Sequence, residues 1–205
     1  MTEDLFRHLR IHANNQPIGS SSFMKKQIDV VDDLFDEKFI KKVSEKYHRC
    51  LFEYGNVSNN PDDAIFWISR HLEDATPLTE CEYQQQIFAK ICEYYKFTDI
   101  DVDDDNIYIN GQTYKLDGSM HIDSEHRTKP DAHYTILYMV NWLHEGIQGF
   151  ETNFGTVDFK PGRVVVFNSL KSHRGLSTEK LNNLRMTLTW KSCSVELDKD
   201  SPLVL

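Results

Sequence analysis

The residues best suited to chemistry are a histidine and an aspartate two positions apart, His121 and Asp123, which follow a glycine turn. In a strand, residues i and i+2 point to the same face, so the two side chains would share one side of a metal site. A third candidate ligand is His173, which follows a Pro-Gly turn, an apolar strand and a short loop. Two histidines and one carboxylate form a facial triad that suits Fe(II) and leaves coordination positions open. The same ligands would also hold zinc with a bound water, so the motif alone leaves the metal undecided.

A second polar pair, Arg185 and Thr187, begins a strand-like segment and shares one face of it through the same spacing. An arginine that faces the interior of a barrel is costly unless it pairs with a carboxylate, and no acidic residue stands next to Arg185 in the sequence. The carboxylate of a ligand would supply that partner through two parallel hydrogen bonds. The alternative is that Arg185 faces outward to solvent.

Strands must position these residues, and the second half of the chain has the pattern of a β domain. After residue 102, short segments rich in β-branched and aromatic residues alternate with Gly, Pro, Asn or Asp turns. Closely spaced short strands predict a sandwich or a barrel. The predicted strands are 106–110, 119–123, 133–141, 149–154, 163–169 and 185–192.

The first half of the chain is mainly helical. One helix is predicted from Asp36 to Tyr54, with apolar residues up to Leu51 at helical spacing. A second helix begins at Thr79, which is three residues before Glu82 and predicts a capping box. We expect both helices to cover one face of an antiparallel sheet. The apolar stripe of the second helix is Ile87, Ile91, Tyr94 and Tyr95, and two short strands are predicted at 25–31 and 64–72.

Composition restricts the class of protein. A chain of 205 residues with 40% hydrophobic content fits one domain with a real core. The formal charge of −9 argues against a nucleic-acid partner, which needs clustered Lys and Arg. No membrane span and no signal peptide are recognisable, so we expect no membrane partner and a cytoplasmic location. The cysteines form no CxxC pair and predict reduced thiols: Cys50, Cys81, Cys92 and Cys193.

The ordered segments YKLDGSMHID, GFETNF, FKPGRVVVFNSLKSHRG and RMTLTWK resemble the iron(II)/2-oxoglutarate-dependent dioxygenases. The resemblance is strongest to their prolyl 4-hydroxylase-like branch, which includes small stand-alone enzymes of bacteria and bacteriophages, and it runs from about residue 106 to residue 192. It implies an α+β, mainly β fold: a double-stranded β-helix (jelly roll) with N-terminal helices packed on the major sheet. The chain would then be a single catalytic domain, residues 1–205. Residues 1–102 would give mainly helical support with edge strands, and residues 103–195 would form the jelly-roll core with the metal site.

The resemblance also implies roles for individual residues. His121, Asp123 and His173 would bind Fe(II), and Arg185 would pair with the distal carboxylate of the co-substrate 2-oxoglutarate. The rest of the 2-oxoglutarate pocket would comprise Thr187, Tyr114 and Tyr138, although a plain core role is a rival interpretation for both tyrosines. The implied reaction uses dioxygen and couples hydroxylation of peptidyl proline to decarboxylation of 2-oxoglutarate, which gives succinate and carbon dioxide. Ascorbate would serve as a reductant.

The substrate is the least determined part of this interpretation. Collagen-type prolyl hydroxylases usually have Lys where this chain has Arg185, so the subgroup is open. The leading hypothesis is a procollagen-proline-type 4-dioxygenase that acts on a proline-containing peptide or protein as a monomer or homodimer. One rival is hydroxylation of a free amino acid, another small molecule or a nucleobase, and another is a non-enzymatic cupin-like binding module. Candidate substrate contacts are Arg127, His133, Trp142, Arg174 and Trp190.

Overall fold

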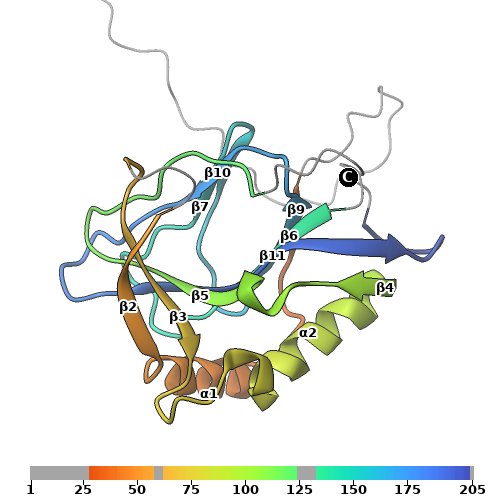
Figure 1. Cartoon of the computed structure of the whole chain (residues 1–205), viewed down its shortest axis with the longest axis horizontal. Helices are drawn as coiled ribbons and strands as arrows, with labels where there is room; N and C mark the ends of the chain where they lie inside the picture. The colour runs from red at the N-terminus through yellow and green to blue at the C-terminus, as the bar shows by residue number, and fades with distance from the viewer. Residues whose placement is uncertain (1–27, 58–61, 124–132, 204–205) are drawn as a thin grey trace, which may run out of the picture.

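The computed structural model describes residues 28–57, 62–123 and 133–203, which form two β-sheets and two α-helices (Figure 1). The large antiparallel sheet has the strand order β1-β9-β6-β11-β5-β3-β2, with β4 paired to the far end of β11. The small sheet has the order β10-β7-β8. The strands of the large sheet are β1 (Ile28–Val31), β2 (Leu51–Asn56), β3 (Phe66–His71), β4 (Phe97–Asp101), β5 (Ile107–Gln112), β6 (His133–Met139), β9 (Val164–Asn168) and β11 (Arg185–Leu197). The small sheet contains β7 (Phe150–Thr152), β8 (Gly155–Val157) and β10 (His173–Gly175).

The long strand β11 lies at the centre of the large sheet between β5 and β6. Its residues alternate between two buried environments, because successive side chains of a strand point to opposite faces. Met186, Leu188 and Trp190 pack into the core beneath the helices, whereas Arg185 and Thr187 line the cavity on the opposite face. One strand therefore supplies both the core and the site.

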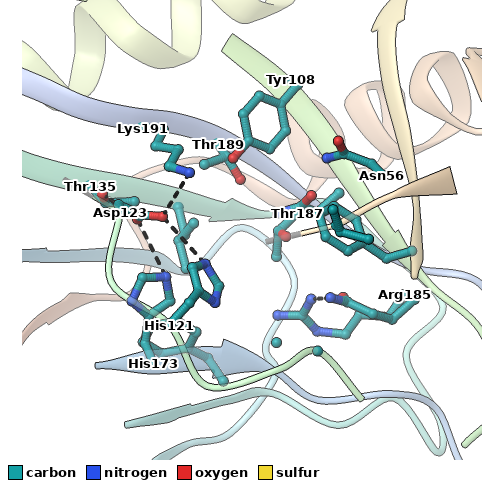
Figure 2. Close-up of a pocket in the computed structure, with 18 residues that line it drawn as sticks. Asn56, Tyr108, His121, Asp123, Thr135, His173, Arg185, Thr187, Thr189 and Lys191 are labelled. Carbon is teal, nitrogen blue, oxygen red and sulfur yellow. Dashed lines mark hydrogen bonds and ion pairs between the residues drawn. The ribbon is translucent and has the colours of Figure 1, made fainter. Parts of the chain in front are cut away.

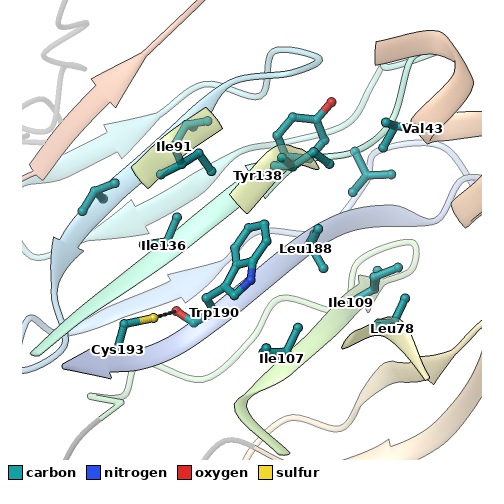
Figure 3. Packing of buried hydrophobic residues seen from close by; sticks show 14 of the residues in the cluster. Val43, Leu78, Ile91, Ile107, Ile109, Ile136, Tyr138, Leu188, Trp190 and Cys193 are labelled. Atoms are coloured by element: carbon teal, nitrogen blue, oxygen red, sulfur yellow. Dashed lines mark hydrogen bonds between the residues drawn. The ribbon is translucent and has the colours of Figure 1, made fainter. Parts of the chain in front are cut away.

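Two helices, α1 (Glu37–Tyr47) and α2 (Glu82–Tyr95), cover one face of the large sheet, and the small sheet lies on the opposite side (Figure 1). Asp36 begins α1 by accepting a hydrogen bond from the backbone N–H of Phe39 at 2.8 Å. Val43 of α1 and Ile91 of α2 are fully buried in the same apolar cluster as Trp190 of β11 (Figure 3). Burying such side chains contributes roughly 1.5–3 kcal/mol each. The helices therefore stabilise the large sheet on the face opposite the site.

A second apolar cluster lies between the two sheets. It joins Leu137 and Met139 of β6 to Phe150 of β7 and Phe167 of β9, all less than 9% exposed. The large sheet therefore has an apolar cluster on each face, one beneath the helices and one against the small sheet. This arrangement confirms the predicted fold, a mainly β jelly roll with helices on the major sheet. None of the helices in the described ranges is long and apolar enough to cross a lipid bilayer. The division into residues 1–102 and 103–195 stays a prediction.

The first predicted helix is too long at its C-terminal end. α1 ends at Tyr47, and the chain turns at Arg49 and Cys50 into strand β2, which pairs with β3. Leu51 fits the helical spacing but is 49% exposed on an edge strand. Pairing with β3 satisfies the backbone of this segment, and this tertiary contact overrides the local helical pattern.

The predicted capping box of the second helix is also wrong. Thr79 belongs to a short 3₁₀ helix, Leu78–Glu80, and α2 begins after Cys81 without a side-chain cap. The apolar stripe is confirmed except for Tyr94, which is 41% exposed. Tyr95, the last predicted member of the stripe, is fully buried.

The strand predictions hold for β1, β3, β5, β6, β7, β9 and β11. The observed β3, β6, β7 and β9 are shorter than predicted, and β11 is longer. Residues 25–27 of the first predicted strand lie outside the described residues. The predicted strand 119–123 is wrong, because this segment makes only one isolated bridge, between His121 and His173. The short loop predicted before His173 is present at 169–172, but His173 itself begins strand β10 instead of lying in the loop. The pairing of His121 with His173 joins residues that are about fifty positions apart, and local sequence carries little information on such pairing.

Candidate metal centre and cavity

The three predicted metal ligands meet at one end of a cavity between the two sheets (Figure 2). The backbones of His121 and His173 exchange two hydrogen bonds, of 3.0 and 2.9 Å. The backbone N–H of Asp123 donates to the carbonyl of Ser169 at 2.9 Å. These contacts hold the loop that carries the first two ligands against β10. As a result, one ligand atom from each residue lies within 4.8 Å of the other two.

Both imidazole rings are oriented by backbone carbonyls. The Nδ1 atom of His121 lies 2.8 Å from the carbonyl oxygen of Ser119, and the Nδ1 atom of His173 lies 2.9 Å from that of Lys171. A carbonyl only accepts hydrogen bonds, so each Nδ1 must carry the proton and donate it. Each Nε2 then presents its lone pair toward Asp123, at 3.4 Å for His121 and 3.3 Å for His173. Such support is typical of metal-binding histidines.

The carboxylate of Asp123 is held by neighbours on β6 and β11. The hydroxyl of Thr135 donates to Oδ2 at 2.6 Å, and the ammonium of Lys191 lies 3.5 Å from Oδ1. The hydroxyl of Ser192 donates to the backbone carbonyl of Asp123 at 3.2 Å. With a side chain only 4% exposed, Asp123 is fixed in one orientation.

The electrostatics give Asp123 and His173 the protonation states that a metal requires, whereas a metal would have to compete with a proton at His121. Burial alone would raise the pKa of Asp123, but the charge of His173, the hydrogen bond with His121 and the charge of Lys191 outweigh it and lower that pKa. Burial lowers the pKa of His173. For His121 burial acts in the same direction, but the hydrogen bond and charge of Asp123 prevail and raise its pKa. Metal ligands must be deprotonated, and an ionised carboxylate beside a neutral imidazole meets this condition.

The donor set therefore fits a divalent first-row transition metal. It offers two imidazole Nε2 atoms and one carboxylate, with all three side chains held by neighbouring groups. The cavity adjoins the three ligands and leaves space for further ligands from outside the protein. Two histidines and one carboxylate with open positions are typical of non-haem Fe(II) sites, and zinc accepts the same donors.

Arg185 lies at the other end of the same cavity, 1% exposed (Figure 2). Its guanidinium donates to the side-chain carbonyl of Gln112 and to the backbone carbonyl of Gln148. Burial lowers the pKa of Arg185 to about 10, partly opposed by the charge of Asp117, so the group stays protonated at neutral pH. The alternative that Arg185 faces solvent is wrong.

Gly175 provides the room that this guanidinium occupies. A Cβ atom at Gly175 would lie 2.9 Å from Nη1 of Arg185 and 2.6 Å from Nε2 of Gln112. Both approaches are closer than van der Waals contact allows, so any larger residue would displace the arginine or its partner. A buried cation aimed into a cavity, without an ion pair in the described part of the chain, is a ready site for an anionic ligand.

Between Arg185 and the metal ligands, the cavity wall is a row of polar residues. Thr187, Thr189 and Lys191 follow Arg185 at intervals of two on β11 and line the cavity with it. Tyr108, Asn110 and Gln112 form a parallel row on β5, and Asn56 and Val57 follow from β2. Of these residues, the sequence predicts only Arg185 and Thr187 as part of the site. The alternation in RMTLTWK was the signal that could have extended the prediction to Thr189 and Lys191.

The two predicted pocket tyrosines do not line this cavity. Tyr138 is fully buried on the helix side of β6, where its ring makes an edge contact with Phe35. Its neighbour Leu137 faces the cavity, and adjacent residues of a strand point to opposite faces. Tyr114 follows β5 and forms an isolated bridge with Thr178 outside the cavity wall. The tyrosine that does line the cavity is Tyr108.

The predicted substrate residues are likewise dispersed. Trp190 is fully buried beneath the helices, stacked on Phe88 at a centroid distance of 5.2 Å, and it cannot reach a substrate. The backbone N–H of Trp142 donates to the hydroxyl of Ser44 on α1, again away from the cavity. For Trp190, as for Tyr138, the strand register, which the sequence does not reveal, decides which face the aromatic ring occupies. Trp142 lies beyond the end of β6, where the chain has left the cavity.

The remaining substrate candidates lie on the surface or outside the described residues. Arg174 forms an ion pair with Glu151 at 2.6 Å, and it does not line the cavity. His133 begins β6, and its Nδ1 atom lies 3.4 Å from the carbonyl oxygen of Ser192. Arg127 lies outside the described residues. Contacts of these residues with a substrate stay predictions.

Neither a protein-family model nor a curated protein matches the sequence significantly, but the fold matches solved structures. A viral collagen prolyl hydroxylase from Paramecium bursaria Chlorella virus-1, in complex with 2-oxoglutarate, has a TM-score of 0.57 at 11% identity over 82% of this chain and 96% of that chain. The prolyl hydroxylase of Trichoplax adhaerens, in complex with a hypoxia-inducible factor peptide, has a TM-score of 0.53 at 16% identity over 81% and 83%. A prolyl-4-hydroxylase of Pseudomonas putida has a TM-score of 0.51 at 13% identity over 84% and 93%.

The chain has the fold of the prolyl hydroxylases. This likeness, at identities of 11–16%, confirms the structural part of the resemblance seen in the sequence. A protein described as a 2OG-Fe(II) oxygenase family member, from Burkholderia pseudomallei, shares it at a TM-score of 0.55 and 13% identity over 82% of this chain and 85% of that chain. Activity must be argued from the site itself.

Proposed function

We propose that this protein is an Fe(II)/2-oxoglutarate-dependent dioxygenase that hydroxylates peptidyl proline. The observation that supports the proposal is the arrangement of one cavity, with a two-histidine, one-carboxylate triad at one end and a buried arginine at the other. An α-keto dicarboxylic acid has matching chemistry, because one end can chelate a metal while the distal carboxylate pairs with a guanidinium.

Each residue has a separate task in this proposal. His121, Asp123 and His173 hold the metal, and the carbonyl contacts of the two histidines keep both Nε2 atoms turned toward it. Arg185 binds the distal carboxylate of 2-oxoglutarate, assisted by the hydroxyl of Thr187 on the same face of β11. When bound, iron with dioxygen and 2-oxoglutarate supplies the oxidising chemistry, which inserts one oxygen atom into a C–H bond and yields succinate and carbon dioxide.

The other residues of the cavity orient Arg185 and exclude water from the site. Gln112 accepts a hydrogen bond from the guanidinium of Arg185 and keeps it directed into the cavity. Phe66, Leu137 and Phe150 form the apolar part of the wall, each less than 9% exposed. An apolar wall excludes water, which strengthens the ion pair between Arg185 and the distal carboxylate of 2-oxoglutarate and protects a reactive intermediate.

The choice of proline as substrate is supported by the folds that the chain resembles, one of which binds a peptide of a hypoxia-inducible factor. Hydroxylation of a free amino acid, another small molecule or a nucleobase is the alternative, although the formal charge of −9 disfavours a nucleic acid. A silent cupin-like module would not need a complete triad together with a buried arginine. A cytoplasmic location, ascorbate as reductant, and a monomeric or homodimeric state belong to the same proposal.

The test has a binding step and a turnover step. Under anaerobic conditions, titration should show Fe(II) binding, followed by 2-oxoglutarate binding that depends on the metal. With dioxygen and ascorbate, a library of proline-containing peptides should stimulate succinate formation and gain one oxygen atom on proline in mass spectra. Stimulation by free amino acids or nucleosides alone would favour the alternative substrate class, and absence of metal and 2-oxoglutarate binding would overturn the enzyme assignment.

A further inference from the structure

Lys191 lies at the metal end of the cavity, as the last member of the row that Arg185, Thr187 and Thr189 begin on β11. The register between β11 and β6 shifts between Trp190 and Cys193, so two residues, Lys191 and Ser192, occupy the space of one. Ser192 has a positive φ of 56°, and a left-handed conformation is uncommon for a residue other than glycine. Such β-bulges are frequent beside active sites. The ammonium of Lys191 faces Asp123 at this point (Figure 2).

The ammonium of Lys191 forms one ion pair in the described part of the chain, with Asp123 at 3.5 Å. The side chain of Lys191 is only 20% exposed, so water solvates the ammonium poorly. A metal ion bound to Asp123 would take up that negative charge. In the proposed complex, the charges of a ferrous ion, Asp123, Arg185 and dianionic 2-oxoglutarate sum to zero. Among the charged side chains of the described residues that line the cavity, Lys191 is then the one without an anionic partner.

Two further polar groups of the same wall lack a partner among the described residues. The hydroxyl oxygen of Thr189 and the side-chain carbonyl of Asn110 are buried without a hydrogen bond. Thr189 is only 2% exposed and lies two residues before Lys191 on the cavity face of β11. Leaving a buried polar group unpaired is unfavourable, so these atoms indicate a polar ligand.

We infer that the substrate carries a carboxylate, which Lys191 binds beside the metal with the Thr189 hydroxyl as a second donor. The inference rests on the proposed function and adds the charge of the substrate to it. A carboxylate carries one negative charge, which matches the single positive charge of Lys191. It can come from an acidic residue next to the target proline, or from the terminal carboxylate of the proline itself. Asn110 would accept a hydrogen bond from a backbone N–H of the same substrate.

Binding can be tested without turnover by loading the protein with Mn²⁺ in place of Fe²⁺ and adding 2-oxoglutarate. Labelled, amidated peptides that differ only by Glu, Gln or Lys beside one proline are titrated and followed by fluorescence anisotropy. The wild-type protein should bind the Glu peptide at least tenfold more tightly than the Gln peptide. Free proline and a peptide with a free C-terminal proline, used as competitors, identify which source supplies the carboxylate, and a tenfold advantage of either over its amide also supports the inference.

The variants make the test specific to Lys191. Lys191→Met should reduce the preference for the carboxylate to within twofold, Lys191→Arg should retain it, and Lys191→Glu should favour the Lys peptide. Lys191→Met should also bind Mn²⁺ at least threefold more tightly in the absence of any substrate, because a like charge beside the metal is removed. Lys90→Met, on the solvent side of α2, is the matched control and should behave as wild type.

The outcomes separate this inference from the proposed function. If Mn²⁺ and 2-oxoglutarate do not bind to the wild-type protein, the proposed function fails, and the inference fails with it. If both bind but the wild type shows no preference for any carboxylate, or the preference persists in Lys191→Met, only the inference is overturned.

Discussion

Replacement of Arg185 by methionine should separate ligand affinity from stability. The guanidinium is 1% exposed, and burial lowers its pKa from the ordinary 12.5 to about 10. Because one pKa unit corresponds to 1.36 kcal/mol, burial disfavours the cation by about 3 kcal/mol before any ligand binds. This cost lies in the free protein and is relieved when a carboxylate arrives.

The expected loss of affinity follows from the same geometry. Truncating one partner of a buried, hydrogen-bonded charge pair typically costs about 2–5 kcal/mol. At about 1.4 kcal/mol per tenfold change, Arg185→Met should weaken 2-oxoglutarate binding by roughly 30-fold to 4,000-fold.

The free energy of unfolding should change much less. Removal of the cation relieves about 3 kcal/mol of burial cost, but the carbonyl groups of Gln112 and Gln148 each lose a donor. An unsatisfied buried acceptor costs roughly 1–3 kcal/mol, so the two effects nearly cancel. We expect the free energy of unfolding of Arg185→Met to lie within about 2 kcal/mol of the wild type.

The assay pairs calorimetric titration of 2-oxoglutarate into Mn²⁺-loaded protein with urea unfolding of the same samples. Arg163→Met is the matched control, because Arg163 forms a two-pronged ion pair with Asp32 outside the cavity, at 2.7 and 2.8 Å. The control should lose stability while it keeps its 2-oxoglutarate affinity. An unchanged affinity in Arg185→Met, or a loss of affinity explained by unfolding, would refute the role assigned to this arginine.

Three other predictions concern the metal ligands, the arginine pocket and pH. His121→Ala and His173→Ala should each abolish 2-oxoglutarate-dependent succinate formation while circular dichroism stays native, and full turnover in either variant would contradict the ligand assignment. Gly175→Ala should weaken 2-oxoglutarate binding at least tenfold without changing Mn²⁺ affinity, because its Cβ would meet the guanidinium at 2.9 Å; equal affinities would show that the pocket is not so tightly filled. The hydrogen bond from Arg163 lowers the pKa of Asp32 below its ordinary value of 3.8, so this pair stabilises the fold above that pH and loses its contribution as the pH falls through the lowered pKa. Urea unfolding at a series of acid pH values should therefore show a shallower decline in Arg163→Met than in wild type, and parallel declines would argue against the coupling.

Several features of the site could be predicted from the sequence because they depend on spacing within one segment. Arg185 and Thr187 share the cavity face of β11 through their separation of two. The amphipathic pattern of α2 predicted its buried side correctly, apart from Tyr94. In both cases the period of the local structure decides which side chains lie together. The residue types of His121 and Asp123 indicated the metal site, although the two lie outside a regular strand.

The identity of the pocket tyrosine could not be predicted in this way. A shift of one residue turns a strand side chain to the opposite face of the sheet. The register of β6 places Tyr138 in the core beneath the helices, and the register of β5 places Tyr108 in the cavity wall. The alternation of β11 accounts for Lys191 on the cavity face, but its contact with Asp123 depends on how distant segments pack. Strand β2 was predicted as helix because its pairing with β3 outweighs its own propensity.

The sequence by itself determined the composition of the site: which side chains can bind a metal, which cation can bind a carboxylate, and that strands must carry them. The tertiary structure alone decided that the two groups open into one cavity and that a lysine joins them. The physical reason is that ligand type and local spacing are properties of single segments, whereas the cavity arises from pairing between distant strands. His173 on β10 reaches His121 through two backbone hydrogen bonds, and only the folded chain brings those segments together.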